Sequence, residues 1–200
     1  MIRPVGVHEG SPAERYPSSA FTIEQRNELE RVAWLKDPHE LRELLESALA
    51  SKAEAGRGWS AWFVALSRAV TDRIAELQAP QAGEVFVELL GHSDRRVREA
   101  AASTLVAEGT EIAPLGPALV GALRHGDANV RRVVGWALGS KKYEPAKREL
   151  IAMLERAGAA DRIFIAQALA EFGDEEADRA LREARRREWR PWVRFSLPRR

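Results

Sequence analysis

The sequence predicts an all-α fold, an α-solenoid (an α-α superhelix) in which helix pairs stack one on the next. Two segments of similar sequence, Asp94–Ala101 and Asp127–Val134, form an internal repeat. Their first residues, both aspartate, lie 33 positions apart, a spacing typical of helical repeats. Apolar residues recur with the period of a helix, and no stretch alternates with period two for long enough to indicate a strand. The connections are short and glycine-rich, as between antiparallel helix neighbours.

Residues 1–20 contain three prolines and few core-forming side chains, which predicts an extended or disordered arm. Residues 21–79 are expected to form N-terminal helices, made of a cap and a degenerate repeat. Thr22 and Gln25 have the spacing of a capping box, which predicts a helix from Thr22 to about Lys36. Asp37 and Pro38 are typical of the start of the next helix, and a third is expected over residues 59–78.

Residues 80–200 are expected to hold the repeats, of which the last is incomplete. The same apolar period and the turn residues between helices define each predicted helix. The predicted helices span about residues 81–91, 94–107, 114–125, 127–139, 145–157, 160–172 and 175–188, with a final fragment from Arg190.

The repeat has a register that separates core from surface. Counted from Asp94 or Asp127 as zero, positions three, seven and eleven share one face of a helix and are apolar in both copies. A third copy starts at Asp161, and a fourth, broken copy starts at Arg190. Positions two, five and nine lie opposite the core and are expected to be exposed.

The pattern Asp-x-x-Val-Arg-x-x-Ala-x-x-Ala-Leu-Gly resembles HEAT repeats, most closely the short HEAT-like repeats of the phycobilisome-lyase type. The resemblance covers residues 80–175 well and 38–78 weakly. It implies that the aspartate caps its helix and that the arginine, Arg98 or Arg131, pairs with the aspartate of a neighbouring repeat. HEAT-like arrays include scaffolds, adaptors, bilin lyases, hydroxylases and DNA-repair glycosylases, so function has to be argued from sites.

The second helix of each HEAT pair lines the concave side of an array, and its exposed positions are the expected partner-binding site. These positions are Arg96, Glu99 and Ser103 in one copy, Asn129, Arg132 and Trp136 in the next, and Ile163, Ala166 and Ala170 in the third. Trp136 stands out because an exposed aromatic ring beside arginine is a typical binding anchor. The alternative is that another segment of the chain covers this ring.

A second candidate site is a basic and aromatic patch near the C-terminus. The last sixteen residues hold seven arginines against the single acid Glu188. The patch comprises Arg186, Arg187, Trp189, Arg190, Trp192 and Arg194. Three interpretations stay open: a half-repeat cap with Trp192, Val193 and Leu197 in the core, a docking or homodimer edge, and a nucleic-acid site.

Composition argues against several other classes of protein. The chain has no cysteine and a net charge of +1, and no apolar run approaches the roughly 20 residues that span a bilayer, so we expect a cytoplasmic protein without a membrane partner. HEAT-like hydroxylases bind di-iron through several His-Glu pairs. This chain has only two such pairs, His8-Glu9 and His39-Glu40. His92 and His125 lie in equivalent turns, but two histidines make a weak metal site.

We therefore expect no catalytic residue, metal or cofactor, and a non-catalytic scaffold or adaptor that binds a protein partner through its concave face. One alternative is a nucleic-acid-binding array, with or without glycosylase-like base excision. A second is a lyase-type protein for a pigment or cofactor.

Overall fold

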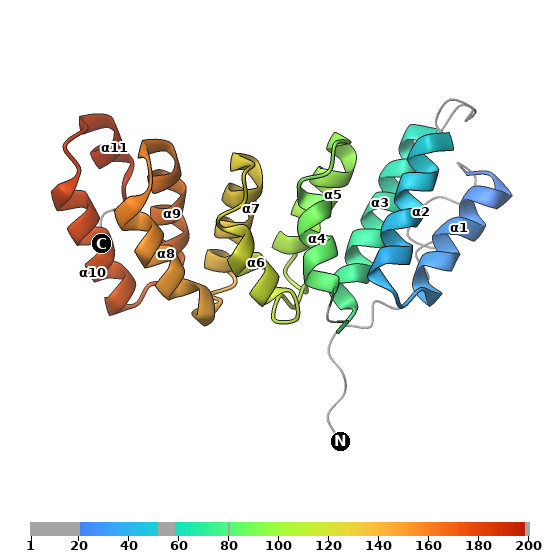
Figure 1. Ribbon diagram of the computed structural model, residues 1–200, viewed down its shortest axis with the longest axis horizontal. Coiled ribbons are helices and arrows are strands. Elements are labelled where there is room, and N and C mark those ends of the chain that lie inside the picture. Colours follow the sequence, from blue (N-terminus) through green and yellow to red (C-terminus); the bar gives the residue numbers. More distant parts are fainter. Residues whose placement is uncertain (1–20, 52–58, 80, 199–200) are drawn as a thin grey trace, which may run out of the picture. The chain divides into compact units, whose positions relative to one another are not determined.

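The computed structural model describes residues 21–51, 59–79 and 81–198, so the predicted arm lies outside the described residues. The described residues form eleven helices and no strand (Figure 1). The chain divides into two compact units, residues 1–114 and 115–200. The predicted fold class, an all-α solenoid of packed helix pairs, is confirmed.

The first unit contains five helices, each starting within a few residues of its predicted position. They are α1 (Ile23–Trp34), α2 (Pro38–Ala50), α3 (Trp59–Glu76), α4 (Ala82–Leu90) and α5 (Arg95–Val106). The capping box at Thr22 is present, because its hydroxyl accepts from the amide of Gln25 at 3.2 Å and the Gln25 side chain accepts from the Thr22 amide at 3.0 Å. Helix α3 is central, since it packs against α1, α2, α4 and α5.

The core of the first unit is apolar with one buried hydroxyl cluster. Phe63, Leu66 and Ile74 of α3 are fully buried. Between α3 and α5, the hydroxyls of Thr71 and Thr104 are 3.0 Å apart, and Thr104 donates to Asp72 at 2.6 Å. These contacts satisfy polar groups that would otherwise be costly to bury.

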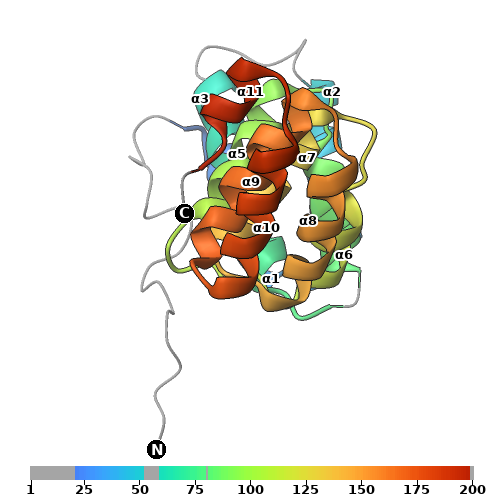
Figure 2. The ribbon, with the colours of Figure 1, turned by 90° about the vertical axis from the view of Figure 1, so that its left-hand side faces the viewer.

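The second unit contains six helices in two layers. They are α6 (Gly116–Ala122), α7 (Ala128–Ser140), α8 (Glu144–Arg156), α9 (Ala159–Phe172), α10 (Glu175–Arg187) and α11 (Pro191–Ser196). Contacts join α6 to α8 and α8 to α10 in one layer, and α7 to α9 and α9 to α11 in the other (Figure 2). Helix α6 is shorter at both ends than predicted.

A close approach of backbones fixes the packing of α7 against α9. A Cβ atom added to Gly139 would lie 2.4 Å from the carbonyl oxygen and 2.7 Å from the Cα of Ala168. Only glycine permits this distance, because backbone atoms cannot move aside as a flexible side chain can. The glycine at the end of the repeat motif is therefore a packing residue.

Candidate interaction surfaces

The turn before each repeated helix is built by the same hydrogen bonds in both copies. Asp94 accepts from the amide of Arg96 at 2.8 Å, and Asp127 from the amide of Asn129 at 2.6 Å, so both aspartates cap their helices as predicted. The Nδ1 atoms of His92 and His125 accept from the amides of Asp94 and Asp127, each at 3.0 Å. The two histidines thus have a structural role that the sequence analysis missed, although the repeated His-x-Asp spacing carried the signal.

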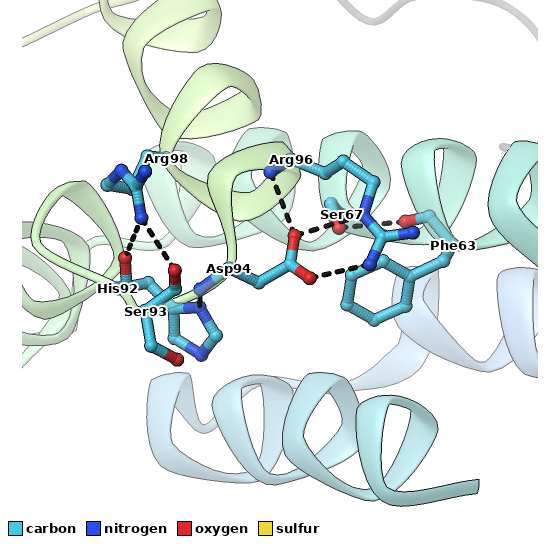
Figure 3. A network of polar contacts seen from close by, with 7 residues as sticks. All are labelled: Phe63, Ser67, His92, Ser93, Asp94, Arg96 and Arg98. Atoms are coloured by element: carbon cyan, nitrogen blue, oxygen red, sulfur yellow. Dashed lines mark hydrogen bonds and ion pairs between the residues drawn. The ribbon is translucent and has the colours of Figure 1, made fainter. Parts of the chain in front are cut away.

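The repeat arginines hold the same turns. Arg98 donates to the carbonyls of His92 at 2.6 Å and Ser93 at 2.7 Å (Figure 3). Arg131 donates to the equivalent carbonyls of His125 and Gly126 and also pairs with Asp161 at 3.0 Å. The inter-repeat pair implied by the HEAT resemblance is therefore present at Arg131.

Asp161 differs from the two earlier aspartates because it does not cap a helix. Helix α9 begins at Ala159 after the N-cap Gly158, so Asp161 lies in the first turn, where it accepts from Arg131.

Arg96 is not the free surface residue that its register position predicts. Its guanidinium donates to both carboxylate oxygens of Asp94, at 3.0 and 2.5 Å, and lies close to the Phe63 ring (Figure 3). The guanidinium carbon is 4.7 Å from the ring centre of Trp59 and 4.9 Å from that of Phe63. The hydrogen bonds from Arg96 lower the pKa of Asp94 to about 2. The long side chain turns back onto buried rings of α3, so Arg96 joins α5 to α3.

The other two predicted positions on α5 are exposed. Glu99 accepts from Arg95 at 2.6 Å, an exposed i,i+4 pair of little energetic weight. Ser103 lies one turn further along the same face. Glu99 and Ser103 therefore lie at the surface of the first unit without the arginine that was expected beside them.

The predicted residues of α7 form an exposed stripe on the second unit. Asn129, Arg132 and Trp136 are all exposed, and their spacing of three and four residues places them on one helix face. Arg132 donates to the amide oxygen of Asn129 at 3.1 Å. The Trp136 side chain is 48% exposed, so no described residue covers it fully. We call these three residues the α7 stripe.

The third copy does not continue this stripe. Ala166 and Ala170 of α9 are buried and Ile163 is half-buried, so the prediction that they are exposed is wrong. Helix α9 packs against α7, α8, α10 and α11, and a helix with neighbours on several sides buries most of its circumference.

The C-terminal patch is largely exposed. Arg186, Arg187, Trp189, Trp192 and Arg194 are exposed, and Arg190 is half-buried with its guanidinium 5.0 Å from the ring centre of Trp189. Val193 and Leu197 are buried as the half-repeat interpretation predicts, but Trp192 is 58% exposed and not part of the core. The prediction that Trp192 belongs to the core is therefore wrong, and the neighbouring ring of Phe195 is also exposed, at 71%.

Glu188 is buried beneath this patch. Its carboxylate pairs with Arg162 of α9 and accepts from the amide of Arg190 at 2.9 Å. The backbone hydrogen bond from Arg190, together with the Arg162 guanidinium, lowers the pKa of Glu188. The acid is thus held inside the fold, where its partners are Arg162 and Arg190.

A cavity of about 360 Å³ lies between α8 and α10 in the second unit. Small side chains on α10 leave this space open over Leu154. Its charged lining is Glu155, Arg162, Glu176, Arg179, Glu183, Arg187 and Arg190. Acids and bases nearly balance, so the cavity itself does not select an anion.

Among the described residues, no group of three or more histidine, aspartate or glutamate side chains is arranged to hold a metal ion. Nor is any helix in the described ranges long and apolar enough to cross a bilayer.

Comparison with known proteins finds one similarity, which lies in the second unit. Residues 116–197, nearly the whole second unit, match the family model of HEAT repeats. The match confirms, over these residues, the resemblance to HEAT repeats drawn from the repeat motif. No curated protein and no solved structure matches the chain.

Proposed function

We propose that the protein is a non-catalytic scaffold or adaptor that binds a protein partner through the α7 stripe. HEAT repeats generally serve as protein-interaction scaffolds, which supports the class. The observation that carries the proposal is the 48% exposed ring of Trp136 one turn from the exposed Arg132. Tryptophan and arginine dominate binding hot spots, because each combines a large contact area with directional polar groups.

Glu99 and Ser103 of α5 remain proposed contacts on the first unit. Arg96 is withdrawn from the proposed contact surface, because binding through its guanidinium would break a bidentate pair and expose the Trp59 and Phe63 rings. We also propose a cytoplasmic location, which the lack of cysteine supports.

The test compares capture of proteins from native lysate by three tagged, full-length forms. The wild-type chain is expected to retain a partner after nuclease treatment, and Arg132→Glu/Trp136→Ala is expected to lose it. The matched control is Arg31→Glu/Trp34→Ala on α1, where both residues are also exposed. Partner capture that is equal for the α7 and control variants would contradict the proposal.

A stability measurement keeps this test interpretable. Because about half of the Trp136 ring is exposed, Trp136→Ala is expected to lower the free energy of unfolding by only about 1 kcal/mol. Both double variants should therefore be folded at the temperature of the capture experiment, as circular dichroism would show.

A further inference from the structure

The C-terminal end of the second unit carries exposed cations and aromatic rings that the proposed function does not use. Figure 2 looks onto this end, with α10 and α11 toward the viewer. We define the C-terminal face by six exposed residues of α10, α11 and the segment between them. They are Arg182, Arg186, Trp189, Trp192, Arg194 and Phe195.

The arginines of this face are available to a ligand. Arg182, Arg186 and Arg194 make no ion pair or side-chain hydrogen bond with any residue that the structure describes. Residues 182–198 hold six arginines and two acids, Glu183 and Glu188. Glu188 is buried and Glu183 lies 3.7 Å from Arg187, so neither neutralises the three free guanidinium groups.

The aromatic rings of the face are equally open. Trp189, Trp192 and Phe195 are 78%, 58% and 71% exposed. Val193 anchors the short α11 into the core, which turns Phe195 outward, with Trp192 and Arg194 on either side of it. Rings this exposed are unfavourable in water, and clusters of them mark interaction sites.

A hydrogen bond joins the two segments that carry most of these residues. Arg185 of α10 donates to the carbonyl of Leu197 at 3.1 Å, which ties the last turn of α10 to the chain just after α11. Arg186 directly follows Arg185 in the sequence, and Phe195 is two positions before Leu197. The two residues therefore lie on neighbouring segments. The contact therefore places Arg186 on the segment next to the helix that carries Trp192, Arg194 and Phe195.

We propose that the C-terminal face binds single-stranded nucleic acid, with the arginines on phosphates and the aromatic rings stacked on bases. Positive charge beside sequence-tolerant stacking platforms is the combination by which single strands are bound without base pairing. A second copy of this chain is a poor occupant, because its own unpaired arginines would face these. A duplex is also a poor ligand, because its bases are already stacked on one another.

The test measures fluorescence anisotropy of labelled oligothymidine and oligouridine, each about fifteen nucleotides long, with the full chain. Saturable binding at low salt is expected, with a slope of log K against log salt of about −2 if three phosphates are neutralised. Trp192→Ala/Phe195→Ala is expected to weaken binding by about 10-fold or more, since each lost ring removes a stacked base. Arg186→Gln/Arg194→Gln should make the slope shallower by about 1.4.

Two controls separate this site from general charge and from the α7 stripe. Arg31→Gln/Trp34→Ala on α1 should leave oligonucleotide affinity unchanged, as should Arg132→Glu/Trp136→Ala. The second result holds whether or not the α7 stripe binds a protein, so the two proposals fail independently.

Four outcomes would overturn the proposal. They are no binding at low salt, binding insensitive to loss of the rings, tighter binding to vesicles of anionic lipid or to polyglutamate than to the oligonucleotides, and dimerisation that the ring variants abolish. The last two would assign the face to a lipid surface, an acidic protein or a second copy.

Discussion

Asp94 and Asp127 occupy the same position in the repeated turn, yet they differ in what each holds in place. Both cap a helix through the amide two residues later. Asp94 also fixes the Arg96 guanidinium against Trp59 and Phe63, whereas the second copy has Asn129 at that position, which cannot form the ion pair. Asp94 therefore has a tertiary role in addition to its cap.

This difference gives a prediction for thermal unfolding. Asp127→Ala is expected to cost about 1 kcal/mol through the lost cap. Asp94→Ala is expected to cost about 2–4 kcal/mol, because it also leaves a partly buried guanidinium without its partner. A loss of only about 1 kcal/mol in Asp94→Ala would show that the Arg96 pair adds nothing to the cap.

The pKa of Asp94 predicts how stability responds to acid. Its folded value of about 2 lies below the ordinary 3.8, so the ionised form stabilises the fold above about pH 4. That contribution, on the order of 2 kcal/mol, is lost as the pH falls from about 4 to 2. Asp94→Asn keeps a capping side chain but cannot ionise, so denaturant titrations should show a smaller loss in this range. A variant with the same acid sensitivity as the wild type would contradict this assignment.

At the scale of elements, the contact of α7 with α9 depends on a missing side chain. Gly139 lies against the backbone of Ala168, and Gly135 lets the Phe164 ring approach to contact distance. The sequence shows Gly139 as the end of a motif, where a turn role is the usual expectation. In the structure Gly139 is not a turn residue, because α7 continues one residue further, to Ser140. Its role is to let the backbones of α7 and α9 approach each other.

Gly139→Ala therefore tests the α7–α9 contact. A Cβ atom at 2.4 Å from a carbonyl oxygen forces α9 to shift, and the expected loss of unfolding free energy is about 1–3 kcal/mol despite the better helix propensity of alanine. Gly121→Ala in α6 is the matched control, since nothing lies within 4 Å of its added Cβ. That variant should be neutral or slightly more stable in the same chemical denaturation. If Gly139→Ala were more stable than the wild type, the backbones of α7 and α9 would be farther apart at this point than the structure shows.

At the scale of the whole molecule, each unit has a core of its own. Leu66 of α3 is fully buried in the first unit and Leu138 of α7 in the second. Stability in stacked helix arrays is set mainly by each repeat and its nearest neighbours. The free energy of local opening is therefore a property of each unit.

Hydrogen exchange followed by mass spectrometry can test this. Leu66→Ala and Leu138→Ala should each cost about 2–5 kcal/mol at their own site. Leu66→Ala is expected to lower amide protection first in α1–α5, and Leu138→Ala first in α6–α11. Uniform loss of protection along the chain in both variants would indicate a single cooperative unit.

The periodic part of the fold could be predicted residue by residue, and the candidate site only in part. Helix starts at Thr22, Asp37, Asp94 and Asp127 follow from capping chemistry, which acts within three residues of the chain. Exposure at positions two, five and nine holds on α7 but fails at Arg96, Ala166 and Ala170. Helical periodicity says which residues share a face, but not how many neighbours cover that face.

The sequence by itself therefore determined the helical class, the repeat register and the HEAT resemblance, because caps, turns and apolar periods are local interactions. Only the tertiary structure decided that Arg96 turns back onto Trp59 and Phe63, that α9 is buried on several sides, and that Glu188 is withdrawn from the surface to Arg162. These contacts join residues about 30 positions apart or lie between helices that no local pattern brings together. The exposed rings and free arginines at the C-terminal face are what remains after that packing is complete.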